Sequence, residues 1–600
     1  MSELQSKPRL IYDGDCGYCI YSVNYWHALT RQAVDYQPYQ AVAAEYPHIP
    51  LEAFKRAVQY IAPNGEVSSA AKASFLTLSH APGHAFWWWL YRYLPGFAWV
   101  AEMVYWLVSK NRDTVYFMCR LCWGSHFQPS TYQFASWLFL RAFALIFLSA
   151  FVSFSGQAAG LIGSDGITPI AALMQLVREQ LGASGVWLFP SVFWLNSSDV
   201  MINVVCKGGI LFSLLLFFNI RPRLCLLFLY LFYVSLIYAG QAFMAFQWDL
   251  LLLEISMIAI VLSTERMLGI WLLRWLLFRF ILASGLVKLV SGDLSWWNFT
   301  ALNYHFYTQP LPTPLAWYAQ QLPETIKQFF TFMTLVIEIG LVFLIFLPRR
   351  LRFIGGFSIL LLQIVIFLTG NYNFFNLTAM ALCLPLYDDA ALKFVLPSKL
   401  TSWLMQRKPG RQAGHLGVGL SVLFAIVTVT ISVIQFGGRF GVEPPALAIQ
   451  AENAFAPLRW VNLYGPFANM TKARHEIILE GSLDGIHWYA YEFKYKPGEV
   501  NGRLKWNVPF QPRLDWQMWF AALSEPQDNP WFYRMLERLL QNSPSVSHLL
   551  AYNPFAVTGP RYIRSRFYDY EFTNVKERRE TGAIWKRALM GEYLPSVQFN

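Results

Sequence analysis

Nine stretches of this chain are long and apolar enough to cross a lipid bilayer, and this feature constrains the fold more than any other. A helix that crosses a bilayer needs about 17–25 residues. Because lipid offers no hydrogen-bond partner, each crossing segment must satisfy its own backbone, and it is therefore helical. The stretches are expected near residues 133–155, 201–219, 223–243, 247–263, 269–290, 328–348, 352–369, 372–387 and 416–436. The sequence thus predicts a polytopic α-helical membrane protein with about nine spans.

The charge content agrees with this class of protein. Only 14% of the residues are charged, against about 25% in soluble domains. The deficit is concentrated between residues 132 and 436, so we expect a soluble domain over 1–125, a membrane core over 126–440 and a second soluble domain over 441–600. The net charge of +11 lies mainly in short loops. Such a distribution is typical of an orientation signal, and nucleic acid is not expected as a partner.

The basic residues predict how the chain faces the bilayer. They gather in alternate loops, which contain Arg221, Arg223, Arg266, Arg349, Arg350 and Arg352. The loops between these are nearly free of Lys and Arg. Since cytoplasmic loops are enriched in both residues, the N-terminus is expected in the cytoplasm and the C-terminal domain on the far side. An odd number of spans is consistent with ends on opposite faces.

A further aromatic segment, residues 84–108, has the composition of a tenth span. It contains Pro95, and its many Trp and Tyr side chains favour the membrane–water interface. We therefore expect helices that lie against the membrane face.

The first soluble domain carries two cysteines in the stretch IYDGDCGYC, residues 11–19. A buried strand is expected before them, and a helix is expected to begin near Cys16. A cysteine in the first helical turn meets unpaired N–H groups and the positive end of the helix dipole, which favour the thiolate. Cys19 lies one turn further along the same face, which suits a resolving thiol. Strand, CxxC helix, strand, helix and a hairpin at Asn64-Gly65 is the order of a thioredoxin-like α/β fold.

Two other interpretations of these cysteines remain open. Cys119 and Cys122 form a second CxxC, and four thiolates suit structural zinc, although the separation of about a hundred residues far exceeds that of a zinc ribbon. Alternatively, the cysteines are unreactive. A redox pair is the favoured interpretation, with no metal and no cofactor, and Cys119 and Cys122 are candidates for a relay to it. Cys206, Cys225 and Cys383 are interpreted as packing residues.

One resemblance makes the redox interpretation specific. YDGDCGYC resembles the signature of the DCC family of thioredoxin-like thiol–disulfide oxidoreductases, and both NGEVSSAAKA and the NRD at 111–113 are similar to later parts of that family. The resemblance covers about residues 7–118. It implies that Cys16 attacks and Cys19 resolves, with Asp13 and Asp15 flanking them. It also implies a protein partner for thiol–disulfide exchange.

Charged side chains within the apolar stretches are a second set of candidates. A charge inside a membrane segment is costly, and it is usually paired or functional. The stretches contain Arg141, Asp249, Glu254, Arg274, Arg279, Lys288 and Glu338, and Asp293 follows shortly after. Opposite charges on adjacent spans most often pair structurally, and we expect such pairing here.

The loops between the spans resemble those of one family. WLFLRAFALIFLSAF, LVKLVSGD, HFYTQPLPTPLAWY and TGNYNFFN are similar to the pattern of the lipase maturation factor family, and the similarity continues through PRLDWQMWFAAL and NPF. It covers about residues 132–600. The resemblance implies a membrane protein that assists the folding and assembly of secreted lipases and cleaves nothing itself.

A more distant resemblance concerns Lys288. SGLVKL, followed by an acidic residue and Trp296-Trp297, is similar to the HTTM domain shared with vitamin K-dependent carboxylases. It implies base chemistry at Lys288 together with a lipid-soluble quinone. The alternative is that Lys288 pairs with Asp293, Glu254 or Glu338.

The C-terminal residues 445–600 alternate with a period of two, as in HEIILEGSLDGIHWYAYEF, and they predict an antiparallel β-rich domain with additional helices. The stretch GSLDGIHWYAYEF weakly resembles one edge of a discoidin-like jelly roll. The domain shows no catalytic constellation, and its aromatic surplus suits binding of another protein's apolar surface. Candidate client-binding residues are Trp516, Trp519, Asn553 and Phe555.

Together these features predict a membrane-bound maturation factor for an exported lipase or related secreted protein, with an accessory redox domain. One alternative is a transmembrane thiol–disulfide oxidoreductase, and another is an HTTM-type carboxylase-like enzyme. The expected partners are the client, a thiol–disulfide partner and the bilayer. A bacterial inner membrane is the favoured location. In a eukaryote we expect the endoplasmic reticulum, where Asn469 in the sequon NMT is a glycosylation candidate.

Overall fold

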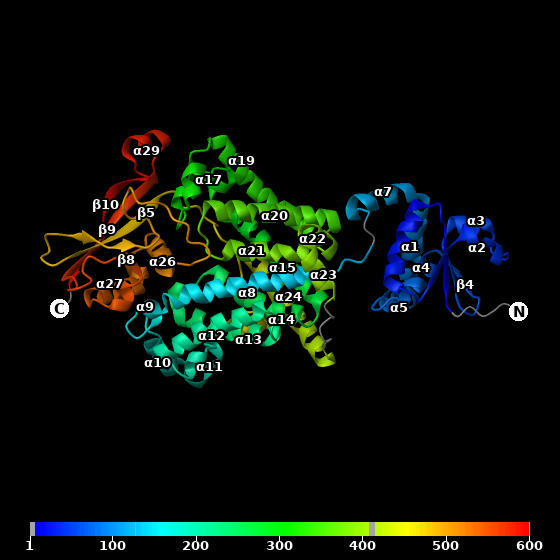
Figure 1. The fold of residues 1–600 in the computed structure, drawn as a ribbon, viewed down its shortest axis with the longest axis horizontal. Coiled ribbons are helices and arrows are strands. Elements are labelled where there is room, and N and C mark those ends of the chain that lie inside the picture. Colours follow the sequence, from blue (N-terminus) through cyan, green and yellow to red (C-terminus); the bar gives the residue numbers. More distant parts are fainter. Residues whose placement is uncertain (1–6, 126–127, 407–413, 599–600) are drawn as a thin grey trace. The chain divides into compact units, whose positions relative to one another are not determined.

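A computed structural model describes residues 7–125, 128–406 and 414–598. The chain forms two compact units. The first comprises the residues up to Thr131 together with Leu347–Phe353, and the second comprises Tyr132–Phe346 and the residues from Ile354 onward. The C-terminal domain and the membrane helices thus belong to one unit, and each unit is described by itself (Figure 1).

The N-terminal unit has a four-stranded sheet in the order β2-β1-β3-β4. The strands are β1 (Arg9–Tyr12), β2 (Asp35–Pro38), β3 (Gln59–Ile61) and β4 (Val67–Ser69). β1 and β2 run parallel because helix α1 (Gly17–Thr30) connects them, whereas β3 and β4 form the expected hairpin. Gly65 adopts a positive φ of 84° at the hairpin turn, a conformation that glycine adopts without steric cost. The thioredoxin-like order of elements is therefore present.

Helices cover both faces of this sheet. Leu10 and Tyr60 pack with α1 and α4 (Ala70–Ser79) on one face. Ile11 and Ile61 pack with α2 (Tyr39–Val42) and α3 (Leu51–Arg56) on the other. The CxxC therefore sits at the end of a strand that is buried from both sides.

The aromatic segment 84–108 forms two short helices. α5 (Ala85–Tyr93) ends just before Pro95, and α6 (Phe97–Lys110) begins after Gly96, whose φ is 82°. Neither helix is long enough to cross a bilayer. The third helix of the series, α7 (Arg112–Trp123), follows directly.

Seven helices of the described residues are long and apolar enough to span a membrane. They are α8 (Gln133–Ser155), α12 (Asp199–Phe217), α13 with the following turn (Pro222–Met244), α15 (Arg266–Val290), α19 with its continuation (Glu324–Phe346), α20 (Arg349–Thr369) and α24 (His415–Arg439). Each of them overlaps one of the predicted stretches. The protein is therefore a multi-pass membrane protein.

Two predicted stretches form shorter helices. α14 (Gln247–Leu262) has 16 residues, and the segment Phe375–Leu386, which begins with α21 (Phe375–Cys383), is shorter still. α14 packs between α13 and α15, and most of its side chains are buried, including those of Asp249 and Glu254. The expected count of about nine spans is therefore not confirmed.

Short helices fill the connections on the side of the C-terminal domain. α9 (Ala158–Ile162), α10 (Ile170–Leu181) and α11 (Gly185–Leu188) lie between α8 and α12. α16 (Leu294–Trp297), α17 (Leu302–Thr308) and α18 (Pro314–Gln320) lie between α15 and α19.

The C-terminal domain contains the predicted antiparallel sheet, in the order β10-β9-β5-β6. The strands are β5 (Arg474–Ser482), β6 (Tyr489–Ala490), β9 (Tyr562–Phe572) and β10 (Trp585–Gln598). A separate ribbon pairs β7 (Glu492–Phe493) with β8 (Leu550–Tyr552). A jelly roll needs eight strands in two sheets, so the described residues form a simpler architecture than the expected jelly roll.

Three longer helices, α26 (Arg513–Ala521), α27 (Pro530–Leu540) and α29 (Val575–Thr581), and the short α28 (Pro544–Ser547) also belong to this domain. α26 packs against β5 on one side and against the turn that follows α13 on the other. Figure 1 shows the sheet at one end of the helix bundle, with α26 between them. α26 thus links the two parts of the unit, and α28 packs against α9 at the same junction.

Close helix packing in the membrane core leads to a first prediction. A Cβ atom added at Gly209 of α12 would lie 2.2 Å from the ring of Phe151 on α8, whereas a Cβ at Gly419 of α24 would meet no atom within 4 Å. We expect Gly209→Leu to cost about 1–3 kcal/mol or more through overpacking. Thermal unfolding in detergent measures the loss, with Gly419→Leu as the matched control. Equal unfolding temperatures for the two variants would contradict the close packing of α12 against α8 at Gly209.

Candidate functional site

The thiol pair is positioned by the turn between β1 and α1. Cys16 is the N-cap residue of α1, and its Sγ accepts a hydrogen bond from the backbone N–H of Cys19 at 3.3 Å. The Cys19 thiol donates to the same sulfur, with 2.6 Å between the two Sγ atoms. Both cysteines are free and half-buried. The geometry places the two sulfurs for direct exchange.

The two sulfurs are not equivalent. Burial raises the pKa of Cys19 above its ordinary value, and its hydrogen bond to Cys16 raises it further. Cys19 therefore keeps its proton, while Cys16 accepts both hydrogen bonds at the positive end of the helix. This asymmetry supports Cys16 as the attacking and Cys19 as the resolving thiol.

The flanking acidic residues organise the turn. Asp13 accepts hydrogen bonds at Oδ1 from the backbone N–H of Asp15 at 3.1 Å and from Nε2 of Gln40 at 2.9 Å. Gln40 also donates to Asp15 and accepts from the N–H of Gly14. A Cβ at Gly14 would lie 2.9 Å from Pro38, so only glycine allows this close approach. Asp13 and Asp15 thus hold the CxxC loop against the start of α2.

Arg112 is a site residue that was not singled out from the sequence. Its guanidinium lies 3.7 Å from Asp13 and donates to the carbonyls of Lys55 and Arg56 at 2.9 and 2.7 Å. It therefore ties α7 to the CxxC turn and to α3. The resemblance of the NRD stretch to the DCC family was the only sequence signal for it.

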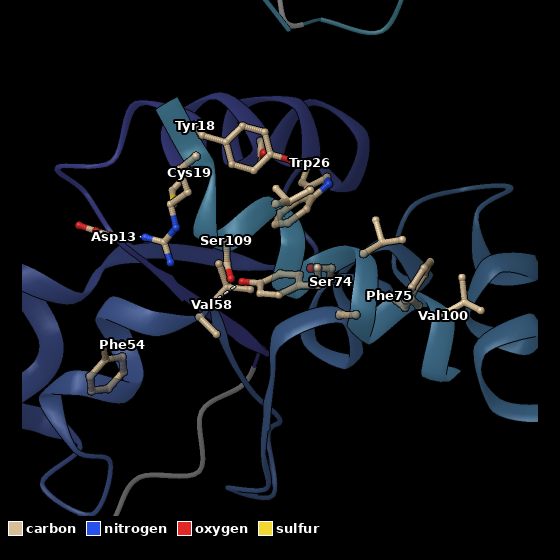
Figure 2. Close-up of a pocket in the computed structure, with 18 of the residues that line it drawn as sticks. Asp13, Tyr18, Cys19, Trp26, Phe54, Val58, Ser74, Phe75, Val100 and Ser109 are labelled. Carbon is tan, nitrogen blue, oxygen red and sulfur yellow. Dashed lines mark hydrogen bonds and ion pairs between the residues drawn. The ribbon is translucent and has the colours of Figure 1, made fainter. Parts of the chain in front are cut away.

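A cavity of about 390 Å³ opens beside Cys19. Figure 2 shows Asp13, Tyr18 and Cys19 at one end of it and Phe75 and Val100 at the other. Its walls come from α1, α4 and α6 and are mostly apolar. Tyr105 of α6 also lines the cavity, and its hydroxyl accepts a hydrogen bond from the N–H of Val58 at 3.0 Å. This volume lies in the range of small-molecule sites, about 300–1,000 Å³.

The second cysteine pair lies on α7, which packs against α1. Cys119 and Cys122 are free and half-buried, and burial raises the pKa of Cys119. Tyr18 and Tyr21 of α1 face them, and burial, followed by the charge of Cys119, raises the pKa of Tyr21 to about 12. A relay through these thiols stays a prediction. Among the described residues, no three His, Cys, Asp or Glu side chains are grouped to hold a metal ion.

A second candidate site lies where α26 meets the membrane helices. Arg513 forms a bidentate pair with Asp249 of α14, with Nη1–Oδ2 and Nη2–Oδ1 distances of 2.9 and 2.8 Å. Both side chains are fully buried. Tyr233 donates to the same carboxylate, and the carbonyl of Phe243 accepts from Arg513 at 2.7 Å. The intramembrane acid thus has its partner in the C-terminal domain.

A further pair follows along α14. Glu254 pairs with Arg279 of α15, as expected for opposite charges on adjacent spans. The C-terminal segment closes over this pair: Tyr464 donates to Glu254 at 2.7 Å, and Arg279 donates to the carbonyl of Asn462 at 2.7 Å. Both charges are buried, so each depends on the other and on these hydrogen bonds.

Lys288 also finds a structural partner. Its Nζ lies 2.5 Å from Glu338, which occupies a single π-helical turn, Val336–Gly340, within the α19 span. A Cβ at Gly285 would clash with Glu338 and Ile339, so glycine lets this turn approach α15. The pair borders a cavity of about 90 Å³. Lys288 is thus paired with Glu338, one of the three partners expected for it. Base chemistry at Lys288 stays a prediction.

Asp293 caps the short helix α16 and links it to the C-terminal domain. Its Oδ1 accepts from the N–H of Ser295 at 2.9 Å, and its Oδ2 accepts from the N–H of Met470 at 2.6 Å. The predicted membrane cluster is thus not one site. It is three separate pairs and a cap, distributed along α14 and α15.

The predicted client-binding residues lie largely inside the fold. Trp516 is buried against Trp248 and Phe246, and Trp519 is half-buried with its Nε1 donating to the carbonyl of Thr308 at 2.9 Å. Phe555 is buried against Gly481, and Asn553 accepts from the N–H of Phe555 at 2.8 Å. Their positions give all four residues structural contacts, and client binding by them stays a prediction.

Arg513 itself was missed as a site residue. It lies in the stretch PRLDWQMWFAAL, whose composition is that of a helix in a soluble domain. Its partner Asp249 lies far away in the sequence. Arg474 is similar: it is fully buried and donates to the carbonyls of Tyr307 and Pro310, both at 2.8 Å, in the HFYTQPLPTP loop. The resemblance of these stretches to one family was the available signal.

The fold and these sites define a multi-pass membrane protein whose C-terminal domain is anchored to its helices by buried ion pairs, with a separate thioredoxin-like dithiol domain. Residues 134–394 match the lipase maturation factor transmembrane domain, residues 460–595 match the lipase maturation factor C-terminal domain, and residues 10–117 match the DCC1-like thiol-disulfide oxidoreductase. The chain belongs to the lipase maturation factor family.

Individual relatives agree. Lipase maturation factor 2 of Xenopus tropicalis is 33% identical over 583 residues, which cover 76% of this chain and 82% of that protein. Lipase maturation factor 2 of Homo sapiens is 32% identical, covering 77% and 82%. Lipase maturation factor 1 of Mus musculus is 32% identical, covering 76% and 86%. No solved structure matches the chain.

The buried pair predicts a large loss of stability on removal of one partner. Arg513→Met leaves the Asp249 charge buried and uncompensated, which costs about 3–5 kcal/mol. Chemical unfolding in detergent measures this loss. Arg534→Met, at an exposed position on α27, is the matched control, and Asp249→Leu combined with Arg513→Met should recover most of the stability. If Arg513→Met and Arg534→Met unfold at the same denaturant concentration, the Asp249–Arg513 pair does not stabilise the fold.

The asymmetry of the thiols predicts selective alkylation. Since the thiolate is the nucleophile and burial raises the pKa of Cys19, we expect iodoacetamide near neutral pH to modify Cys16 about tenfold faster or more. Raising the pH should reduce the difference between the alkylation rates of Cys16 and Cys19. Peptide mass mapping measures both rates, and the buried Cys206 and Cys383 serve as unreactive controls. Faster modification of Cys19 would reverse the assignment.

Proposed function

We propose that this protein is a membrane-bound maturation factor for an exported lipase or a related secreted protein, with an attached thiol–disulfide redox domain. The observation that carries the proposal is the similarity of both the membrane core and the C-terminal domain to lipase maturation factors over most of their length. A folding factor of this kind binds its client and cleaves nothing.

Buried hydrogen bonds at the junction support a rigid platform for the client. Gln511 exchanges hydrogen bonds with Ser153 and Gln157 of the α8 end, with distances of 2.8 Å. Arg513, which pairs with Asp249, follows Gln511 by two residues. A domain held by several buried polar contacts keeps its surface in a fixed orientation, which reduces the entropy lost when a client binds.

The surface best suited to a client lies on the exposed side of the C-terminal domain. Ile486, in the turn between β5 and β6, is 76% exposed, and Val557, in the loop after β8, is 92% exposed. The two loops are neighbours, since the rings of Tyr489 and Phe555 are 6.1 Å apart. Exposed apolar side chains on adjacent loops are typical of a protein-binding surface. Asn553 and Phe555 would then support this surface from below.

The proposed orientation follows the basic loops. The N-terminal domain would lie in the cytoplasm with a thiol–disulfide partner protein, and the C-terminal domain would lie on the far side with the client. A bacterial inner membrane is the favoured compartment, and the endoplasmic reticulum is the alternative in a eukaryote. Asn469 is exposed and lies on the proposed far side, which suits a glycosylation site in that case.

Secretion of an active lipase tests the function. Cells that lack this gene and express a candidate lipase are complemented with the full-length protein. We expect active secreted lipase to rise on complementation while the lipase transcript stays constant. No rise with any lipase of the same organism would contradict the proposal. A Cys16→Ser variant that abolishes the effect by itself would favour the transmembrane oxidoreductase instead.

The client surface gives a sharper prediction. We expect Ile486→Ser combined with Val557→Ser to lower lipase secretion and client co-purification by about fivefold or more, because each exposed apolar anchor contributes on the order of 1 kcal/mol or more to binding. Protein level and unfolding midpoint should not change, since neither side chain is buried. Val575→Ser on α29 is the exposed control. Unchanged co-purification would exclude this surface.

A further inference from the structure

The cavity beside Cys19 has a polar end and an apolar body. Cys19, Asp13, Arg112 and Ser109 lie at its polar end. Trp26, Phe75, Phe97 and Val104 are among the apolar residues of its body. Such a site fits an amphiphilic molecule whose polar group meets the thiol and whose apolar part extends between α4 and α6 (Figure 2).

The apolar wall of this cavity is also an exposed surface. Val100 and Val104 of α6 line the cavity, yet they are 46% and 49% exposed. Around them, α5 and α6 expose a dense set of aromatic side chains, namely Phe86, Trp87, Trp89, Tyr93, Trp99 and Trp106. Arg92 and Lys110 stack on neighbouring rings of the same helices, with Lys110 4.1 Å from the Trp106 centroid.

This composition suits the membrane–water interface. Trp and Tyr with flanking basic residues are enriched where a helix lies at the headgroup level. The chain enters its first membrane span at Gln133, ten residues after α7 ends, so only a short linker separates these helices from that span. A molecule dissolved in the bilayer could therefore reach the cavity through its α6 wall.

We propose that the cavity binds a membrane-soluble quinone, which oxidises the Cys16–Cys19 pair. An acyl chain would fill the apolar body but would leave the dithiol without an electron acceptor. A peptide disulfide would be expected to meet Cys16 at the surface, whereas the cavity presents Cys19. A quinone has an apolar tail, a flat ring for the aromatic walls and carbonyl oxygens that can accept from the guanidinium of Arg112.

The reaction balances with these groups and one proton from water. Cys16 remains the attacking thiol toward a protein disulfide, and the quinone step reverses the two roles because only Cys19 lines the cavity. The deprotonated form of Cys16 takes up the Cys19 proton along their hydrogen bond, and Cys19 then adds to the quinone ring. The Cys16 sulfur then attacks Cys19, which forms the S–S bond and leaves the electron pair on the ring. One thiol, one thiolate and one quinone thus give one disulfide and one hydroquinone, in which one quinone oxygen receives the Cys19 proton and the other receives a proton from water. The inference rests on the proposed redox role of this pair.

The test uses the purified full-length protein in detergent. The thiols are reduced, the reductant is removed, and a short-chain benzoquinone or naphthoquinone is added. Hydroquinone absorbance and free thiols report the rate, and mass spectrometry separates loss of two hydrogens from arylation of a cysteine. We expect one hydroquinone for each disulfide.

Two variants of α6 make the test specific. Ala101 lines the cavity, so Ala101→Phe should slow oxidation by the quinone by about tenfold or more through overpacking of the bound ring. Met103→Phe, at an exposed position outside the cavity lining, should match the wild type. Diamide, a small soluble thiol oxidant, should form the disulfide equally in all three proteins, which shows that Ala101→Phe folds.

The outcomes separate the two proposals. If diamide forms the disulfide but the quinone does not, or if Ala101→Phe reacts with the quinone at the wild-type rate, the quinone site is overturned while the redox pair stands. If neither oxidant forms a Cys16–Cys19 disulfide, the proposed redox function of the domain fails, and the quinone site fails with it.

Discussion

The bidentate pair between Asp249 and Arg513 determines how the two parts of the larger unit are joined. Asp249 lies in the first turn of α14, deep among apolar helices, and its charge could not remain there without a cation. The cation is supplied by a helix of the C-terminal domain. The cost of burying either charge alone therefore favours the docked state of α26, and Tyr233 and the carbonyl of Phe243 add further hydrogen bonds to the pair.

Other contacts extend this principle along the junction. Glu254 with Tyr464, Asp293 with Met470, and Arg474 with the carbonyls of the loop before α18 each join a membrane-side element to a C-terminal one. The polar loops that resemble one family, such as HFYTQPLPTP, thus have a physical reason for their composition. Their backbone carbonyls are the docking partners of buried cations, so the C-terminal domain and the membrane helices form one compact unit.

Sequence patterns predicted those elements that depend on local rules. The long apolar helices were predictable because lipid enforces helical hydrogen bonding, and the hairpin at Asn64-Gly65 was predictable from its turn residues. Pairing of Glu254 with Arg279 was also expected. Arg513 was not found because its partner lies in a distant span, and Trp516 was assigned to a surface because composition does not separate core aromatics from exposed ones. Contacts between distant segments decide both cases.

At the thiol site, too, some features follow from local sequence and others from contacts between distant segments. The CxxC and its helix were evident from the sequence, since a cysteine at an N-cap has a defined local environment. The order of the two thiols depends further on burial of Cys19, and the cavity beside it depends on α6, some ninety residues away along the chain. The match to the oxidoreductase ends at residue 117, and the match to the maturation factor begins at 134. Because each part has its own core, a dithiol domain can be joined to a maturation-factor core without altering the buried pairs that link the membrane helices to the C-terminal domain.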